Sequence, residues 1–548
     1  MLKKILKLNF WLPIVIYALL AFLISFPLLA KGYVFTLDNI TPPFYKMPID
    51  TTTWRFFYQL FLAKLNLLMP SYVIEKIILF LMIFLSGLGM HKLVPTKSEW
   101  PKYFAGIFYI FNPFFYSRFM IGQWTLLLAY SLTPFAIKSY LDFMDISNWK
   151  NALISIFWTI LITFINLRNL NILAIFIVII LAIIIIKSSK NLKKLLIIFA
   201  IFLASATIFL FLSSKWLFPL FNTDGKDILN VDKQQEMVFK SQADGKTGLY
   251  FNLAALYGFW GDSENHYLDQ KVYVPGWSLL ALLILILTVI GIYRGLKNEK
   301  TKYPIIVLLI ASLLGFLLSI GINNQFIYKI DQFFQQIFFI EALREPQKFI
   351  AILCISYAYF GAIGLDYFLE ISQKNKLARI LCITTMLILP VIYSPGLIWG
   401  TYKQLKTTNY PASWSEANTI LTQDTSNFNV LVFPWHRYMS FGFSNGRVIE
   451  NPTSIFFTKP IISGDNMEMG SIYTQSVSHR SEFIKNEVLD KKDSISNLGD
   501  KMLGFNVKYI LLLKEADWLE YGFISHQTDL ELVFDNNEVS LYKSTNFK

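Results

Sequence analysis

The chain has 548 residues, of which 54% are hydrophobic and only 16% are charged, whereas soluble domains carry about 25% charged residues. The net charge is +12, but Lys and Arg collect in short segments between apolar runs, which indicates a membrane protein and argues against a nucleic-acid partner. Both cysteines, Cys354 and Cys382, lie in apolar runs, so neither a disulfide framework nor a cysteine-based metal site is available.

Eleven apolar segments are predicted to cross a bilayer as helices, since a crossing needs about 20 mostly apolar residues. The first follows a basic start and lacks a convincing cleavage site, so we interpret it as an uncleaved span. The third and fifth are short and are compatible with re-entrant or tilted helices. The predicted spans lie near residues 9–30, 72–91, 103–118, 123–141, 151–166, 169–187, 194–213, 274–294, 303–322, 347–369 and 378–399.

The distribution of basic residues predicts the orientation of these spans. With the N-terminus inside, the short cytoplasmic segments, such as 92–102, carry most of the Lys and Arg residues, which is the positive-inside pattern. The C-terminus then lies outside. The sequence therefore predicts a membrane domain, 1–399, and an extracytoplasmic domain, 400–548. The long polar loops predicted to lie outside are 31–71, 214–273 and 323–346.

Outside the spans, helical spacing of apolar residues over 51–70 predicts an amphipathic helix along the outer interface, or else a core helix of the outer domain. In the tail, Ser413 and Glu416 have the spacing of a capping box that opens a helix. The runs 429–435 and 507–513 are typical of buried strands, and 530–543 of a hairpin that turns at Asn536–Asn537. These elements predict a small α/β domain.

The candidate functional residues lie at the outer ends of the spans. Asp38, in "YVFTLDNITPPF", follows the first span and is either an ordinary solvated carboxylate or a catalytic acid or base. In "EALREPQKF", Pro346 suits the first turn of the tenth span. The exposed N–H groups of that turn, with Arg344 and Lys348, would suit a phosphate at headgroup depth. Alternatively, these cations pair with Glu341 and Glu345 or extend toward the interface.

Two further clusters are candidates for cavity contacts. In "NPFFYSRFMIGQWTLLLAYSLTP", Asn112–Pro113 breaks a helix. The polar and aromatic residues after it either line a cavity or stabilise a tight turn. In "YGFWGDSENHY", aromatic rings beside carboxylates suit sugar binding by stacking and hydrogen bonding, although a divalent metal is not excluded. The candidates in these two clusters are Arg118, Gln123, Trp124, Trp260, Asp262, Glu264 and His266.

These motifs together resemble the GT-C superfamily of membrane glycosyltransferases, and in particular the actinobacterial α-arabinofuranosyltransferases. The resemblance rests on Asp38 in the first outer loop, Asn112–Pro113 followed by Arg118 and "GQWTLLLAYSLTP", "LREPQKF", and the tail "LGFNVKYILLL…LELVFDNNEVSLYK". It implies that Asp38 removes the proton of an acceptor hydroxyl while that oxygen attacks the anomeric carbon of a polyprenyl-phosphate-linked sugar. Some enzymes of this type have two acids in this loop, but here the next acid, Asp50, is distant.

We therefore expect an inverting glycosyltransferase that needs no cofactor, with a divalent metal left open. Arg344 and Lys348 would stabilise the leaving phosphate. The acceptor would be a glycan, glycolipid or glycoprotein of the cell envelope, outside the cell membrane. The expected cavity contacts are Arg118, Gln123, Trp124, Trp260, Asp262, His266 and Glu345. The alternatives are a transporter or flippase for lipid-linked sugars, which would need charges deep in the spans, and a catalytically inactive assembly partner.

Overall fold

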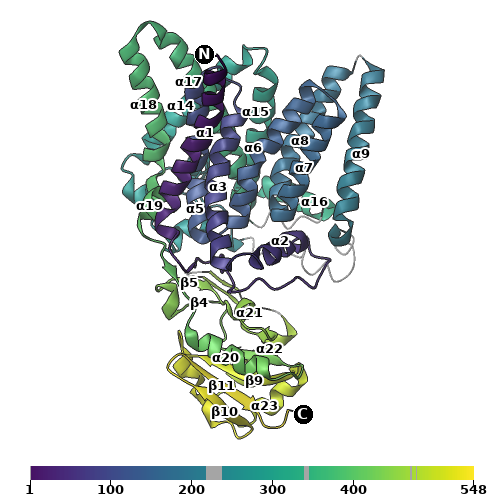
Figure 1. Ribbon diagram of the computed structural model, residues 1–548, viewed down its shortest axis with the longest axis vertical. Coiled ribbons are helices and arrows are strands. Elements are labelled where there is room, and N and C mark those ends of the chain that lie inside the picture. Colours follow the sequence, from purple (N-terminus) through teal and green to yellow (C-terminus); the bar gives the residue numbers. More distant parts are fainter. Residues whose placement is uncertain are drawn as a thin grey trace.

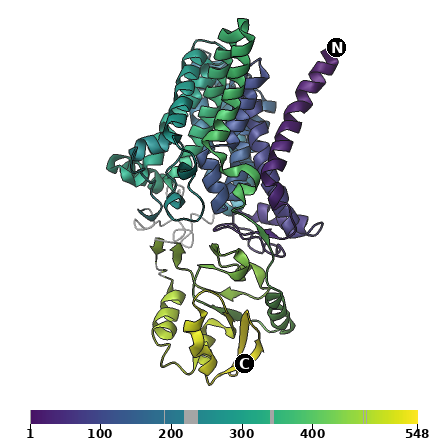
Figure 2. The same ribbon diagram turned by 90° about the vertical axis from the view of Figure 1, so that its left-hand side faces the viewer.

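The computed structural model describes residues 2–189, 191–217, 237–338, 345–469, 472–474, 476 and 478–547. A bundle of long helices carries an α/β region, formed by the C-terminal part of the chain, at one end (Figure 1). The N-terminus lies at the opposite end of the bundle, as both views show (Figures 1 and 2). We call the end that carries the α/β region the domain-side end.

All eleven predicted spans are helical, and the third is divided into two helices. The bundle helices are α1 (Leu2–Ser25), α3 (Ser71–Leu93), α4 (Glu99–Ile110), α5 (Pro113–Ile121), α6 (Trp124–Asp145), α7 (Trp149–Ile165), α8 (Leu167–Ser188), α9 (Leu192–Leu217), α14 (Trp277–Leu296), α15 (Lys302–Ile320), α17 (Ile350–Ile371) and α18 (Lys376–Tyr393). Eight helical segments in the described part of the chain are long and apolar enough to cross a membrane. The chain is a polytopic helical membrane protein, and the predicted count of eleven crossings and their direction stay predictions.

The break inside the third span follows from two adjacent residues. Asn112 caps α5, because its side-chain oxygen accepts a hydrogen bond from the Phe115 N–H at 2.9 Å. Pro113 occupies the first helical position, where the N–H that it lacks has no partner to lose. α5 ends at Gly122, which has a left-handed backbone with φ of 91°. The predicted break at Asn112–Pro113 is confirmed.

Shorter helices occupy the loops at the domain-side end. α2 (Phe56–Asn66) lies across this end of the bundle (Figure 1) and confirms the helix predicted within 51–70. Its Phe57 ring stacks on Phe164 of α7, with ring centroids 4.7 Å apart. A helix, α16 (Gln325–Phe338), also occupies part of the predicted loop 323–346. The remaining short helices are α12 (Gly248–Ala254), α13 (Gln270–Tyr273) and α19 (Ile398–Tyr402).

The C-terminal α/β region contains a mixed five-stranded sheet in the order β10–β11–β9–β3–β6, in which β3 runs parallel to both β9 and β6. Its strands are β3 (Asn429–Phe433), β6 (Ile461–Ile462), β9 (Val507–Leu513), β10 (Leu530–Asp535) and β11 (Val539–Ser544). The two predicted strands and the predicted hairpin are confirmed. The helices beside this sheet are α20 (Ala412–Gln423), α21 (Thr453–Phe456), α22 (His479–Ile484) and α23 (Leu498–Met502). Short two-stranded pairs are formed by β4 (Tyr438–Ser440) with β5 (Val448–Glu450) and by β7 (Met467–Met469) with β8 (Ile472–Thr474).

The sheet separates two hydrophobic clusters because side chains alternate between its faces. Val430 and Val432 of β3 pack in the cluster that contains Trp414 of α20, whereas Leu431 and Phe433 pack in the opposite cluster. The predicted capping box is wrong. α20 begins at Ala412, and the Ser413 hydroxyl donates to Glu538 in the hairpin connection instead of capping the helix.

The first loop of the chain lies between the bundle and the α/β region. β1 (Tyr33–Val34) pairs with β2 (Thr407–Thr408), which precedes α20. Phe35 is buried in the same cluster as Trp414. The Glu450 N–H donates to the Leu37 carbonyl at 3.0 Å. Asp38 is therefore located at the junction of the two parts.

Gly122 supports this loop and provides a test of the fold. A Cβ at position 122 would lie 1.9 Å from the Thr36 hydroxyl and 2.6 Å from the Asn39 nitrogen, on a backbone with positive φ. We expect Gly122→Ala to lower the free energy of unfolding by about 1–3 kcal/mol, measured as a lower midpoint of thermal unfolding in detergent. Gly504→Ala is the control, because an added Cβ there meets no atom within 4 Å. Equal midpoints for the two variants would contradict the close approach.

Candidate active site

Asp38 is held by its backbone and by its side chain. Its N–H donates to the Ile121 carbonyl at 2.8 Å, at the end of α5. Its half-buried carboxylate accepts a hydrogen bond from the Gln123 side-chain amide at 3.1 Å. Both partners flank Gly122, so the tight approach of the loop to this glycine places the carboxylate beside the turn between α5 and α6.

The rest of the loop is anchored by Glu75 in the first turns of α3, a residue that the sequence analysis missed. Its buried carboxylate accepts hydrogen bonds from the Val34 N–H at 3.0 Å and from the Thr41 hydroxyl at 2.7 Å. The Asn39 amide donates to it at 3.4 Å, and Lys76 forms an ion pair with it at 2.8 Å. One carboxylate thus fixes the loop on both sides of Asp38, and no local sequence pattern indicated this role.

A chain of polar contacts leads from Asp38 into the bundle. Gln123 donates to Asp38 with its amide nitrogen and accepts from Arg118 with its amide oxygen at 2.7 Å. The fully buried Arg118 also donates to Glu345 at 2.9 Å, and Glu345 forms an ion pair with Lys348 at 2.9 Å. Three predicted cavity residues, Arg118, Gln123 and Glu345, are therefore brought together with Asp38 and Lys348.

Further contacts fix the Arg118 guanidinium. It donates to the Gln347 side chain and lies over the ring of Phe259, 3.9 Å from its centroid. These contacts join α5 to the segment that precedes α17 and to the loop that contains Phe259. The arrangement is rigid because nearly every polar atom of the guanidinium has a partner, with Nε as the exception among the described residues.

The environment of Asp38 makes it a weaker acid than usual. Burial raises the pKa of this carboxyl to about 6, and the negative charges of Glu345 and Glu450 act in the same direction. The hydrogen bond from Gln123 and the positive charge of Arg168 oppose this increase in pKa. A carboxylate with a pKa of about 6 is ionised at neutral pH and is a stronger base than an exposed aspartate, as general-base catalysis requires.

The structure describes only one of the two residues predicted to bind the phosphate. Lys348 is buried and pairs with Glu345, which is the pairing that the sequence left open as the alternative. Arg344 lies outside the described residues. Pro346 begins a 3-10 turn, Pro346–Phe349, that leads directly into α17. The predicted position of Pro346 at the start of this span is therefore confirmed.

Arg168 is a second residue that the sequence analysis did not assign to the site. It is near the start of α8, where Asn166 caps the helix by accepting from the Arg168 N–H at 3.1 Å. Its charge acts on both Asp38 and Lys348. In the described part of the chain its half-buried guanidinium has no hydrogen bond or ion pair. The only sequence signal was its position in an outer turn.

The cluster that contains Asp262 borders this network. The Asp262 carboxylate accepts from the Tyr267 hydroxyl at 2.6 Å and from the Phe259 N–H at 3.2 Å, and burial raises its pKa to about 6. Trp260 is buried, and its indole N–H has no partner among the described residues. The Trp124 indole is also buried and donates to the Phe119 carbonyl at 2.9 Å, so it supports the turn.

A cavity of about 710 Å³ opens beside the Asp38 loop. Leu37 and Met120 line it next to His266, whose Nε2 atom has no hydrogen-bond partner among the described residues. Gly446, Arg447 and Val448 of the α/β region complete one wall. His266 and the residue before Asp38 thus line the same cavity. Within the described ranges, no group of three or more His, Cys, Asp or Glu residues is placed to hold a metal ion.

Comparison with solved structures shows a similarity of overall architecture. The arabinofuranosyltransferase AftD from Mycobacteria, solved by cryo-electron microscopy, matches 97% of this chain with a TM-score of 0.54 and 12% sequence identity. The chain therefore shares the fold of the matched part of AftD. The match covers 41% of the AftD chain, so the present chain spans less than half the length of that protein. At 12% identity, this similarity concerns the fold.

A second structure is more distant. The archaeal oligosaccharyltransferase AglB from Archaeoglobus fulgidus, solved with an inhibitory peptide and a dolichol-phosphate, has a TM-score of 0.42 and 11% identity, over 91% of this chain and 65% of that chain. No protein-family model and no curated protein matches the chain.

The role of Glu75 gives a prediction that is independent of activity. Glu75→Ala removes the acceptor of three loop hydrogen bonds and leaves Lys76 without its ion-pair partner. Because each such bond contributes about 0.5–1.5 kcal/mol, amide hydrogen exchange over residues 34–41 should become about tenfold faster, measured by mass spectrometry. Exchange in β9 should not change. Glu416→Ala, at an exposed position of α20, is the control, and unchanged exchange in the loop would show that Glu75 does not anchor it.

Proposed function

We propose that the protein is a glycosyltransferase that moves a sugar from a polyprenyl-phosphate-linked donor to a cell-envelope glycan or glycoconjugate. The observation that carries the proposal is a half-buried carboxylate, Asp38, with a pKa of about 6, connected through Gln123 to a cluster of buried cations. The GT-C-like fold supports it.

In the proposed reaction, Asp38 accepts the proton of the acceptor hydroxyl while the hydroxyl oxygen attacks the anomeric carbon. The bond from that carbon to the phosphate oxygen breaks, and the lipid phosphate leaves with the electron pair. A single displacement of this kind inverts the anomeric configuration. No metal ion is part of the proposed mechanism, because the cations of the chain itself can stabilise the charge that develops on the phosphate.

The partners of the cations support a phosphate at this place. Arg118 and Lys348 are paired with Glu345, whereas the guanidinium of Arg168 has no hydrogen bond or ion pair in the described part of the chain. Glu345 already pairs with Arg118 and Lys348, so we propose Arg168 as the main contact of the donor phosphate. Lys348 would also bind the donor phosphate where the phosphate competes with Glu345 for it. Arg344 stays a proposed ligand of the same phosphate.

We also propose that this reaction takes place on the outer face of the cell membrane, with the N-terminus inside and residues 400–548 as an extracytoplasmic domain. The positive-inside pattern of the short loops supports this orientation. A donor carried on a lipid suits the outer face, because nucleotide sugars are made in the cytoplasm. A flippase for lipid-linked sugars and an inactive assembly partner are the competing functions, and the first experiment separates all three.

Purified protein with a panel of synthetic polyprenyl-phosphate sugars and labelled acceptor glycans should form a glycosidic product. Asp38→Asn should reduce the rate of transfer by about 10²–10⁴-fold, because the amide cannot accept the proton, while donor binding changes little. Unreduced transfer in this variant would remove Asp38 as the base. Movement of the lipid-linked sugar across the bilayer without a product would favour a flippase, and neither activity would favour an assembly partner.

The raised pKa of Asp38 predicts the acidic limb of the pH profile. Only the carboxylate form accepts a proton, so kcat/KM should fall about tenfold from pH 7 to pH 5 for a pKa of about 6. An aspartate with its ordinary pKa near 3.9 would lose only about one tenth of its activity over this range. Asp262→Asn is the control, because Asp262 has a similar pKa. The acidic limb should persist in Asp262→Asn, and its disappearance there would assign the limb to Asp262.

The proposed role of Arg168 is tested by the effect of its substitution on the KM for the donor. Arg168→Ala should raise the KM for the donor by about tenfold or more, and Arg168→Lys should restore part of the loss because the charge remains while the bidentate geometry is lost. Arg379→Ala, at an exposed position on α18, should leave the KM unchanged. An unchanged donor KM in Arg168→Ala would exclude Arg168 as a phosphate contact.

A further inference from the structure

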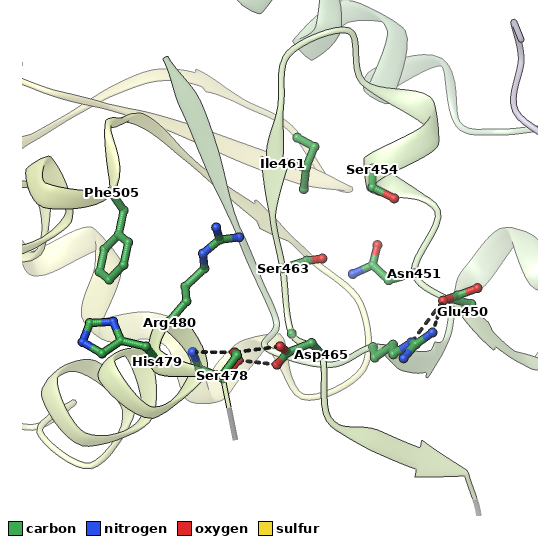
Figure 3. A pocket seen from close by; sticks show the side chains of 13 residues that line it. Glu450, Asn451, Ser454, Ile461, Ser463, Asp465, Ser478, His479, Arg480 and Phe505 are labelled. Atoms are coloured by element: carbon green, nitrogen blue, oxygen red, sulfur yellow. Dashed lines mark hydrogen bonds and ion pairs between the residues drawn. The ribbon is translucent and has the colours of Figure 1, made fainter. Parts of the chain in front are cut away.

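A second cavity, of about 640 Å³, lies within the α/β region (Figure 3). Its walls come from several parts of the chain that are separate in sequence. These are the residue before β4, the segment from β5 into α21, the segment around β6, the start of α22 and Phe505 before β9. The volume is within the range of about 300–1,000 Å³ that is common for small-ligand sites. The reaction proposed above uses none of the residues that line this cavity.

The lining is polar and presents hydrogen-bond donors and acceptors on several sides. The polar side chains that line the cavity include Arg437, Glu450, Ser454, Asp465, His479 and Arg480. Ile461 and the ring of Phe505 supply the apolar part of the wall. Mixed donors and acceptors beside one aromatic ring suit a ligand with many hydroxyl groups. They do not suit a lipid chain, which needs a continuous apolar wall.

Hydrogen bonds between its walls preorganise the cavity. Asp465 accepts from Ser478 at 2.9 Å and from Ser481 (Figure 3). It also accepts from Ser476 at 2.8 Å. These bonds join the segment after β6 to the start of α22. Gly464 permits a close approach to the segment between β3 and β4, since a Cβ at position 464 would lie 2.7 Å from the His436 nitrogen.

Some polar groups of the lining remain available to a ligand. Arg437 donates twice to one oxygen of Glu450, at 3.0 and 2.9 Å, and the other Glu450 oxygen has no partner in the described part of the chain. The exposed guanidinium of Arg480 and the exposed hydroxyl of Ser454 likewise have no side-chain partner among the described residues. These groups lie on different walls (Figure 3), so a single polyhydroxylated molecule could contact them together.

The cavity lies next to the Asp38 loop. Glu450 lines it, and the Glu450 N–H donates to the carbonyl of Leu37, the residue before Asp38. The charge of Asp38 acts on Arg437, which also lines the cavity. A molecule bound here would therefore extend toward the catalytic carboxylate from the side of the α/β region, opposite to the helix bundle where a lipid donor must lie.

We infer that this cavity binds the acceptor as a saccharide, holding the sugar units next to the one whose hydroxyl reaches Asp38. This inference rests on the proposed function. It assigns the recognition of the acceptor to the α/β region and the recognition of the donor phosphate to the helix bundle. An acceptor of several sugar units should therefore bind more tightly than a single sugar, because only the longer molecule reaches both Asp38 and the cavity.

The test uses the full-length protein in nanodiscs and a pool of cell-envelope oligosaccharides from the source organism, released by mild acid and labelled with 2-aminobenzamide. Ser454→Trp fills the cavity from an exposed position, and Arg480→Ala removes the unpaired guanidinium. Both should reduce the retained oligosaccharide by about tenfold or more. Ser415→Trp, an exposed serine on α20 outside the cavity, should stay within about twofold of the wild type. Equal thermal midpoints would show that all variants are folded.

The inference is overturned if the wild type retains oligosaccharide and neither Ser454→Trp nor Arg480→Ala reduces that retention. It is also overturned if the wild type retains no oligosaccharide. Kinetic measurements separate this result from a failure of the proposed function. The two cavity variants should raise the KM for the acceptor and leave the hydrolysis of donor alone unchanged. Cavity-dependent retention without any transfer would refute the glycosyltransferase and leave the saccharide site. Transfer with an unchanged acceptor KM would refute the site and leave the enzyme.

Discussion

The buried guanidinium of Arg118 is the contact on which the rest of the candidate site depends. A cation without exposure to water is tolerated only where neighbouring groups satisfy it, since an unpaired buried charge costs several kcal/mol. Gln123, Glu345, Gln347 and the ring of Phe259 meet this requirement. Two of these partners also contact other residues of the candidate site: Gln123 orients Asp38, and Glu345 pairs with Lys348. One electrostatic requirement thus determines the positions of several polar groups.

The position of the first loop is the second constraint. From the bundle, Gly122 and Glu75 hold it in place. From the α/β region, pairing of β1 with β2 and the contact of Glu450 with Leu37 hold it. Asp38 therefore lies where the two parts of the protein meet. This location connects the two proposals, which place the lipid-linked donor on the bundle side and the acceptor glycan on the side of the α/β region.

The electrostatics of the site differ from those that the sequence suggested. The motif "LREPQKF" drew attention to Lys348 as a phosphate ligand, but Glu345 lies three residues earlier and neutralises it in part. The positive charge without a described partner is that of Arg168, which comes from α8, far from the motif in sequence. The local motif indicated Lys348 and Glu345 of this cluster of charges but not Arg168.

Features that consecutive residues encode could be predicted from the sequence by itself. The length of the apolar runs determined the helical segments, Asn112–Pro113 determined the break between α4 and α5, and Pro346 determined the start of the tenth span. Short, nearly continuous apolar runs determined β3 and β9, and Asn536–Asn537 determined the hairpin turn. Asp38 was also a candidate from its position after the first span. The capping box at Ser413 failed because a tertiary partner, Glu538, took the hydroxyl.

Only the tertiary structure decided which of these residues meet. Arg118 and Glu345 are separated by 227 positions and Gln123 and Asp38 by 85, so no spacing pattern relates them. Likewise, no spacing pattern relates Glu75 to the Asp38 loop, or Arg168 to Asp38 and Lys348. The raised pKa of Asp38 arises from burial and from neighbouring charges that the fold supplies. Periodicity and helix signals act over a few residues, whereas burial and ion pairing depend on which distant segments pack together.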